Sequence, residues 1–170
     1  MHPIAQKIAE RFPQAFVEAK EYRGELTVVV KREQIVEVAR FLHDEPGLEF
    51  DHLTDICSVD YPDRSASGGE RFDVVYHLNS INRHHRLCLK ASVPEDDCVI
   101  DSVCPVWRGA NFLEREVYDL MGIRFRGHPD LRRIFLPEDF DGHPLRKEYP
   151  AEGKGWRNTF EFLQIQKGES

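Results

Sequence analysis

Residues 122–150 constrain the fold of this 170-residue chain more than any other stretch. The segment holds four prolines and three glycines, which forbid a long helix and make a regular central strand improbable. It is not composed like a disordered linker, because nine large apolar side chains are spread along it from Ile123 to Tyr149. We therefore expect an irregular segment whose apolar side chains fill pockets and whose arginines pair with carboxylates, as in protein interfaces.

The residues before this segment follow helical and strand patterns in turn. Strands are predicted at residues 15–22, 26–31, 48–60, 72–78 and 87–93. Helices are predicted at residues 4–12, 35–42 and 111–121, with a short helical turn at 99–103. This order predicts the α+β class: a two-layer domain with helices on one face of a mixed or antiparallel sheet of about five strands, followed by an extended irregular C-terminal tail. We expect an α+β body at 1–121 and a partner-binding segment at 122–170.

The helix at 111–121 carries the most local signals. Asn111 is expected to cap it, with Glu114 completing a capping box, and Gly122 to end it. The expected buried stripe is Leu113, Val117 and Leu120. Three acids crowd this helix and could do acid–base work: Glu114, Glu116 and Asp119. Because the apolar stripe is expected to face the core, we expect these acids instead to pair with arginines of the tail or of a partner.

Charge and cysteine spacing exclude several classes of function. The net charge of −7 argues against a general nucleic-acid binder. The charge is uneven, because residues 122–157 carry a local +2 and residues 1–121 carry −8. Cys57, Cys88, Cys98 and Cys104 form no C-x-x-C pair, so neither zinc-finger nor iron–sulfur spacing is present. The longest purely aliphatic run, Val28 to Val30, is far too short to span a bilayer.

The segment also repeats a short motif. Gly127-His128-Pro129 and Gly142-His143-Pro144 lie fifteen residues apart, and each is followed closely by Leu-Arg. Two copies do not make a repeat protein. They indicate that the same turn is used twice, with glycine permitting the bend and proline fixing the exit.

Two sequence blocks, 114–133 and 139–150, resemble the signature of the C-subunit family of the respiratory NADH–quinone oxidoreductase (complex I). The resemblance implies an accessory, non-redox subunit of the peripheral arm of a proton-translocating enzyme, with no catalytic centre in this chain. It implies no cofactor bound here, with FMN and iron–sulfur clusters in partner subunits. The expected partners are the quinone-site subunit and the iron–sulfur subunits. The expected location is the cytoplasmic face of the bacterial inner membrane, with membrane contact only through the assembled complex. No nucleic-acid partner is expected.

The tail is expected to wrap the quinone-site subunit. We expect the contact residues to be Glu114, Arg115, Glu116, Asp119, Phe125, His128, Arg132, Arg133, Phe135, Phe140, His143, Arg146, Lys147 and Tyr149. A close alternative is the equivalent subunit of a membrane-bound hydrogenase or of another donor–quinone reductase. A distant alternative is a metal-dependent hydrolase whose ligands would come from His128, Asp130, Asp139, Asp141 and His143.

Overall fold

The structure is a computed structural model that describes residues 1–154. The elements in chain order are α1 (Pro3–Arg11), β1 (Phe16–Tyr22), β2 (Glu25–Val30), η1 (Arg32–Gln34), α2 (Ile35–Asp44), β3 (His52–Asp60), α3 (Pro62–Ala66), β4 (Phe72–Ser80), β5 (His85–Val93), β6 (Val99–Asp101), α4 (Ala110–Met121) and β7 (Arg124–Arg126).

Five strands form one mixed sheet in the order β1-β2-β5-β4-β3. The pair β2–β5 is parallel and the other three pairs are antiparallel. The β1–β2 hairpin turns through Arg23 and Gly24, both at positive φ (53° and 81°), as a tight two-residue turn requires. The predicted α+β class with a five-stranded mixed sheet is confirmed.

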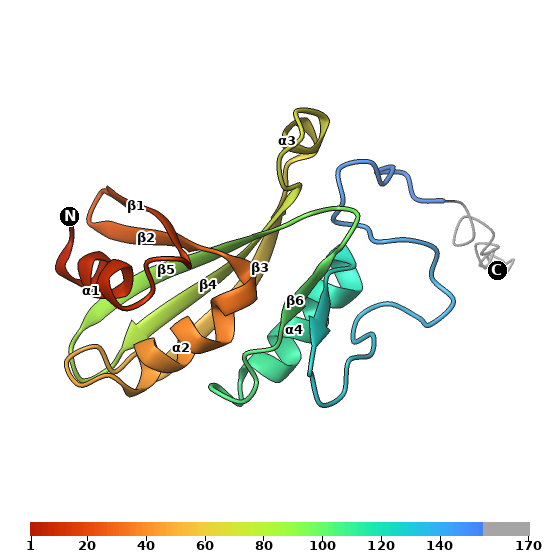
Figure 1. Ribbon diagram of the computed structural model, residues 1–170. Helices are drawn as coiled ribbons and strands as arrows, with labels where there is room; N and C mark the ends of the chain where they lie inside the picture. The colour runs from red at the N-terminus through yellow and green to blue at the C-terminus, as the bar shows by residue number, and fades with distance from the viewer. Residues whose placement is uncertain (155–170) are drawn as a thin grey trace, which may run out of the picture.

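The core lies on one face of this sheet, where alternate residues of neighbouring strands meet. Val28, Leu89 and Tyr76 form one row across β2, β5 and β4, and each is 0% exposed. The helix α2 covers this face with the four residues that its periodicity singled out, Ile35, Val38, Ala39 and Leu42, all 0% exposed. Figure 1 shows α1 and α2 on this side of the sheet, with α4 and β6 beyond them.

The helical turn predicted at 99–103 is wrong, because Val99–Asp101 is the strand β6. It pairs in parallel with β7, which starts 25 residues later at Arg124. The β-branched pair Val99-Ile100 suits a strand, but its partner is distant in sequence. Phe125, at the centre of β7, is 2% exposed and belongs to the core.

The predicted cap of α4 is also wrong. The helix begins at Ala110 after Gly109, without a side-chain cap. Trp107 sets the entry to the helix, since its indole N–H donates to Phe50 O at 3.0 Å. The residues of α4 that are fully buried are Ala110, Glu114, Val117, Asp119 and Met121, whereas Leu113 and Leu120 are only half-buried.

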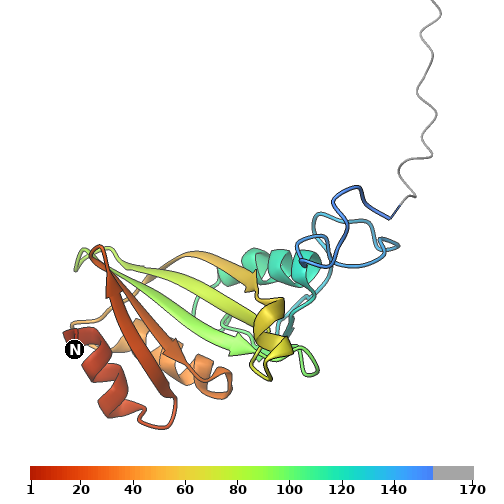
Figure 2. The same ribbon diagram turned by 90° about the horizontal axis from the view of Figure 1, so that it is seen from above.

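Residues 127–154, called the tail from here on, contain no helix or strand. The tail runs past α4 at the end of the molecule opposite to α1 and the N-terminus (Figures 1 and 2). Within residues 1–154, no helix is long and apolar enough to cross a membrane. The boundary that we expected at residue 121 stays a prediction.

Candidate partner interface

Asp119 holds the middle of the tail. Its carboxylate Oδ2 accepts the backbone N–H groups of three consecutive residues, Ile134, Phe135 and Leu136, at 3.0, 2.8 and 2.9 Å. Burial alone would raise the pKa of Asp119, but these donors and the Arg133 guanidinium outweigh it and hold the pKa below its ordinary value. The ionised carboxylate therefore fixes a tight turn of the tail against α4.

The carboxyl end of α4 is bonded to the second Gly-His-Pro motif. His143 Nδ1 donates to Asp119 O at 3.0 Å, and Arg146 Nε donates to Met121 O at 2.7 Å. Between them, the backbone N–H of Leu145 donates to Leu120 O at 3.0 Å. The tail thus satisfies three carbonyls that a helix end leaves without partners.

Gly122 allows this close approach. It stands at φ 76°, and a Cβ on it would lie 2.5 Å from His143 Nε2, a distance that forces a rearrangement. Burial, with Arg146 and Arg133 nearby, lowers the pKa of His143, which keeps the ring neutral beside the two arginines.

The first Gly-His-Pro motif contacts the other end of α4. His128 Nε2 lies 3.0 Å from Asn111 O, and the N–H of Asp130 donates to His128 Nδ1 at 2.9 Å. Each copy of the motif therefore places its histidine against a main-chain carbonyl of the same helix, one copy near each end. Gly127 and Gly142 both take positive φ (79° and 103°), as the predicted use of one turn twice requires.

Arg115 joins the outer side of α4 to the tail. Its Nε and Nη2 donate to Arg132 O and Arg133 O at 3.1 and 3.3 Å. Its guanidinium also lies over the ring of Phe112, 5.6 Å from the centroid. Arg115 is thus used within the chain, where it fixes Phe112 beside the turn that carries Phe135.

A buried ion pair at the start of β4 holds the end of the tail. Arg71 binds Asp60 through two bonds of 2.8 and 2.9 Å, and it also pairs with Glu95 and with Glu148 of the tail. Asp60 accepts the backbone N–H of Lys147 at 2.8 Å. Burial would raise the pKa of Asp60, but Arg71 and this N–H lower it, so the carboxylate stays charged and binds the tail.

The structure places the predicted contact residues in several different environments. Glu114 and Phe125, at 0% and 2% exposed, lie inside the chain's own core and offer no surface to a partner. Seven others make the contacts that join the tail to α4 or to the body: Arg115, Asp119, His128, Arg133, His143, Arg146 and the backbone of Lys147. Phe140 and Tyr149 stack on each other at 5.8 Å, and Glu116 is half-buried on α4. Arg132 and Phe135 face outward.

The expected contact residues left out three apolar side chains that the structure shows to be exposed: Phe112, Ile134 and Leu145. Phe112 and Phe135 are each 62% exposed, which is unusual for phenylalanine. The available signal for Phe112 was its position on the helix outside the stripe of Leu113, Val117 and Leu120. We call the set Phe112, Ile134, Phe135 and Leu145 the apolar ridge.

The tail does not gather the metal ligands that we considered. His143 donates to a carbonyl, Asp130 pairs with Arg132, and Asp141 pairs with Lys154. Among residues 1–154, a different trio brings its ligand atoms within 4.8 Å of one another: Cys104, Glu114 and His128. This trio does not suit a metal ion, because His128 Nδ1 accepts an N–H and the proton of the neutral ring is therefore on Nε2, which faces the trio.

The cysteine thiols are also poor nucleophiles. Burial raises the pKa of all four, that of Cys104 to about 11, and all four are free and half-buried. The thiolate is the nucleophilic form. The sites of these cysteines therefore favour packing over chemistry.

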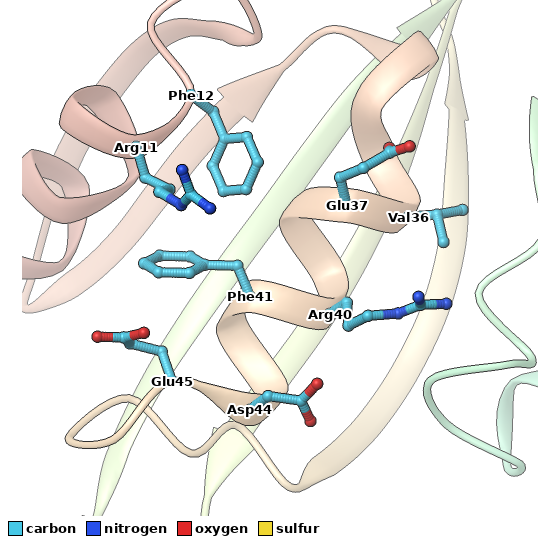
Figure 3. Close-up of a pocket in the computed structure, with 8 residues that line it drawn as sticks. All are labelled: Arg11, Phe12, Val36, Glu37, Arg40, Phe41, Asp44 and Glu45. Carbon is cyan, nitrogen blue, oxygen red and sulfur yellow. The ribbon is translucent and has the colours of Figure 1, made fainter.

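A groove between α1 and α2 (Figure 3) lies at the end of the molecule away from the tail (Figure 1). Phe12 and Phe41 meet edge to face at 5.4 Å along it, and Arg11 lies over the Phe12 ring. The other lining side chains are mainly charged, of both signs: Glu37, Arg40, Asp44 and Glu45. This mixed lining does not resemble an enclosed catalytic pocket.

Comparison with known proteins decides the family. The family described as "Respiratory-chain NADH dehydrogenase, 30 Kd subunit" matches residues 28–155. The chain belongs to this family. A protein of Geotalea uraniireducens, named as the C subunit of NADH-quinone oxidoreductase, is 51% identical over 147 residues, 86% of each chain. One of the same name from Roseiflexus sp. is 46% identical over 157 residues, 92% of this chain and 88% of the relative.

Two solved structures share the fold. The trypsin-resistant fragment (1-134) of Nqo5 is 36% identical with a TM-score of 0.62, and the match covers 75% of this chain and 99% of that one. A chain of the membrane-bound sulfane sulfur reductase, an archaeal respiratory membrane complex, has a TM-score of 0.72 at 24% identity, covering 87% of this chain and 84% of that one. The second likeness supports the fold alone.

Proposed function

We propose that the chain is an accessory, non-redox subunit of the peripheral arm of a proton-translocating NADH–quinone oxidoreductase, and that α4 and the tail dock onto the quinone-site subunit. One observation carries the docking proposal. A buried carboxylate, Asp119, is committed to a turn that holds Ile134 and Phe135 outward.

The apolar ridge is the surface proposed for the contact. Holding Phe112 and Phe135 in water has no benefit for the isolated chain, since both would gain free energy by burial. Arg115 contacts both parts of this surface, because its guanidinium lies over the Phe112 ring of α4 and donates to Arg132 O in the tail. A pre-organised surface loses less conformational entropy when a partner covers it. Arg132, at 70% exposed, lies at the rim and is available to a partner carboxylate.

The electron carriers, FMN and iron–sulfur clusters, would reside in partner subunits. The spacing of the four cysteines supports this part of the proposal, because none of them forms the C-x-x-C pair that is usual in cluster-binding sequences. The complex would place the chain at the cytoplasmic face of the bacterial inner membrane, attached through its partners.

The Nqo5 relative supports a tail that is less firmly held than the body. Its solved fragment resists trypsin and comprises residues 1–134. We propose that the present tail is likewise the part that trypsin reaches first in the isolated chain, and that the quinone-site subunit protects it in the complex.

Co-purification of a tagged chain from membranes tests the proposal. The double variant Phe112→Ser/Phe135→Ser should lower recovery of the quinone-site subunit about tenfold or more, the effect expected of two interface hot spots. The matched control is Ile81→Ser, which removes an apolar side chain that is 60% exposed in the turn between β4 and β5. Equal recovery with both variants would exclude the ridge as the docking surface.

The same purification separates the alternatives. Flavin and iron–sulfur subunits with NADH–quinone activity would support the proposal. If a nickel–iron hydrogenase or subunits for another electron donor co-purified instead, the proposed docking surface would stand, but the proposed reaction would be wrong.

A further inference from the structure

The carboxyl group of Glu114 lies inside the fold, where α4 meets the loop after β6 and the first Gly-His-Pro turn. Glu114 is 0% exposed. Its partners are neutral donors: the Ser102 hydroxyl at 2.6 Å and the Val103 N–H at 2.7 Å. Among residues 1–154 the carboxyl has no lysine or arginine partner. Burial without a cation disfavours the ionised form and raises the pKa of Glu114 to about 7.

Three other ionisable side chains lie near Glu114: Cys104, Tyr76 and Asp101. The Cys104 thiol, 3.5 Å from Glu114 Oε2, has a pKa raised to about 11. Tyr76 of β4 is fully buried, and burial, Glu114 and Asp101 raise its pKa well above the ordinary value. Asp101 of β6 is paired with Arg126. Burial raises the pKa of the Cys104 and Tyr76 groups away from neutrality, whereas it brings the pKa of the Glu114 carboxyl to about 7.

His128 offers one N–H to two acceptors. Because Nδ1 accepts the Asp130 N–H, the neutral ring carries its proton on Nε2. That nitrogen lies 3.0 Å from Asn111 O and 4.0 Å from Glu114 Oε2. Asn111 lies in α4, where its carbonyl can accept a hydrogen bond within the helix, so it keeps a partner if His128 turns away.

The charge of Glu114 decides between the two acceptors. A hydrogen bond to a carboxylate is roughly twice as strong as one between neutral groups. We propose that ionisation of Glu114 moves the His128 N–H from Asn111 O to the carboxylate, and so tightens the first Gly-His-Pro turn against α4 as the pH rises through neutrality. The start of the tail thereby becomes sensitive to proton concentration, whichever partner the tail binds.

NMR spectroscopy of the full chain between about pH 5.5 and 8.5 tests this proposal. The proton on His128 Nε2 should move downfield with the same midpoint as the side-chain carboxyl ¹³C signal of Glu114. The exchange protection of the Asp130 amide, corrected for its intrinsic rate, should rise roughly three- to tenfold as its acceptor ring becomes better anchored.

Glu114→Gln should abolish both responses, and Glu116→Gln, which changes a half-buried acid of the same helix, should leave them intact. A response that persists in Glu114→Gln would overturn the proposal. The unmodified chain decides the matter even if Glu114→Gln does not fold. There, a Glu114 signal that titrates without a change at His128, or that does not titrate in this range, would equally overturn it.

Discussion

The body and the tail of this chain are held by different forces. The body buries rows of apolar side chains between a sheet and its helices, with Val28, Tyr76 and Leu89 fully enclosed. The tail buries few, and it is attached by hydrogen bonds to the main chain of α4 and by two buried carboxylates, Asp60 and Asp119. Hydrophobic burial is spread over many contacts, whereas the attachment of the tail depends on a few polar groups. Single substitutions should therefore be able to release the tail and leave the body folded.

Leu42→Ala should have the largest effect, and it should act on both regions together. The substitution leaves a cavity in the enclosed core beneath α2 and costs about 2–5 kcal/mol. Denaturant unfolding followed by circular dichroism should show one cooperative transition at a lower midpoint. If Leu42→Ala altered only the tail and left the midpoint of unfolding unshifted, the contrast drawn here between body and tail would be contradicted.

Asp119→Asn should release the tail alone. An amide oxygen is a weaker acceptor than a carboxylate for the three N–H groups of residues 134–136, and groups left without a partner cost about 1–3 kcal/mol. Trypsin should cut after Arg132 or Arg133 several times faster, while the unfolding midpoint of the body stays nearly constant. Unchanged cleavage would show that Asp119 does not hold the tail.

Gly122→Ala should also loosen the tail, by about 1–2 kcal/mol, because a positive φ strains any side chain. Here the new Cβ also meets His143. Gly24→Ala is the matched control, because Gly24 has a similar φ of 81° with nothing within 4 Å of its Cβ position. Both variants should destabilise the backbone, but the one at Gly122 should additionally speed trypsin cleavage of the tail.

The last effect should be a pH trend in stability carried by Glu114. Its pKa is raised from 4.5 to about 7 in the folded chain, so near neutral pH the folded state holds a proton that the unfolded state has released. The stabilisation is fully present below the unfolded pKa and is lost as the pH rises through about 7. The free energy of unfolding of the unmodified chain should therefore fall between pH 5 and pH 8, and this fall should be smaller in Glu114→Gln. If Glu114→Gln and the unmodified chain showed the same dependence of stability on pH, the raised pKa of Glu114 would be contradicted.

The sequence predicted the body well because its signals are local. The periodicity of α2 and the alternation in β5 survive into the structure, since both elements bury one face. The strand β6 was missed because its partner β7 lies 25 residues away, beyond any local pattern. The positive φ shared by the two glycine turns was predictable, but the groups that these turns contact were not.

The attachment of the tail was harder to predict for a physical reason. His128, His143 and Arg146 bind main-chain carbonyls of α4, and such acceptors are the same at every residue. The sequence therefore identified these side chains as binding groups without showing that the chain itself supplies their partners. The same ambiguity led us to assign buried Glu114 to a partner surface.

Amide hydrogen exchange of Ile134, Phe135 and Leu136 in the isolated chain tests the pre-organised docking surface most directly. If the Asp119 carboxylate fixes this turn before any partner arrives, the three amides should exchange at least about tenfold more slowly than an unstructured peptide. In Asp119→Asn that protection should fall for all three together. Exchange at the unstructured rate in the unmodified chain would contradict a surface that is formed in advance of binding.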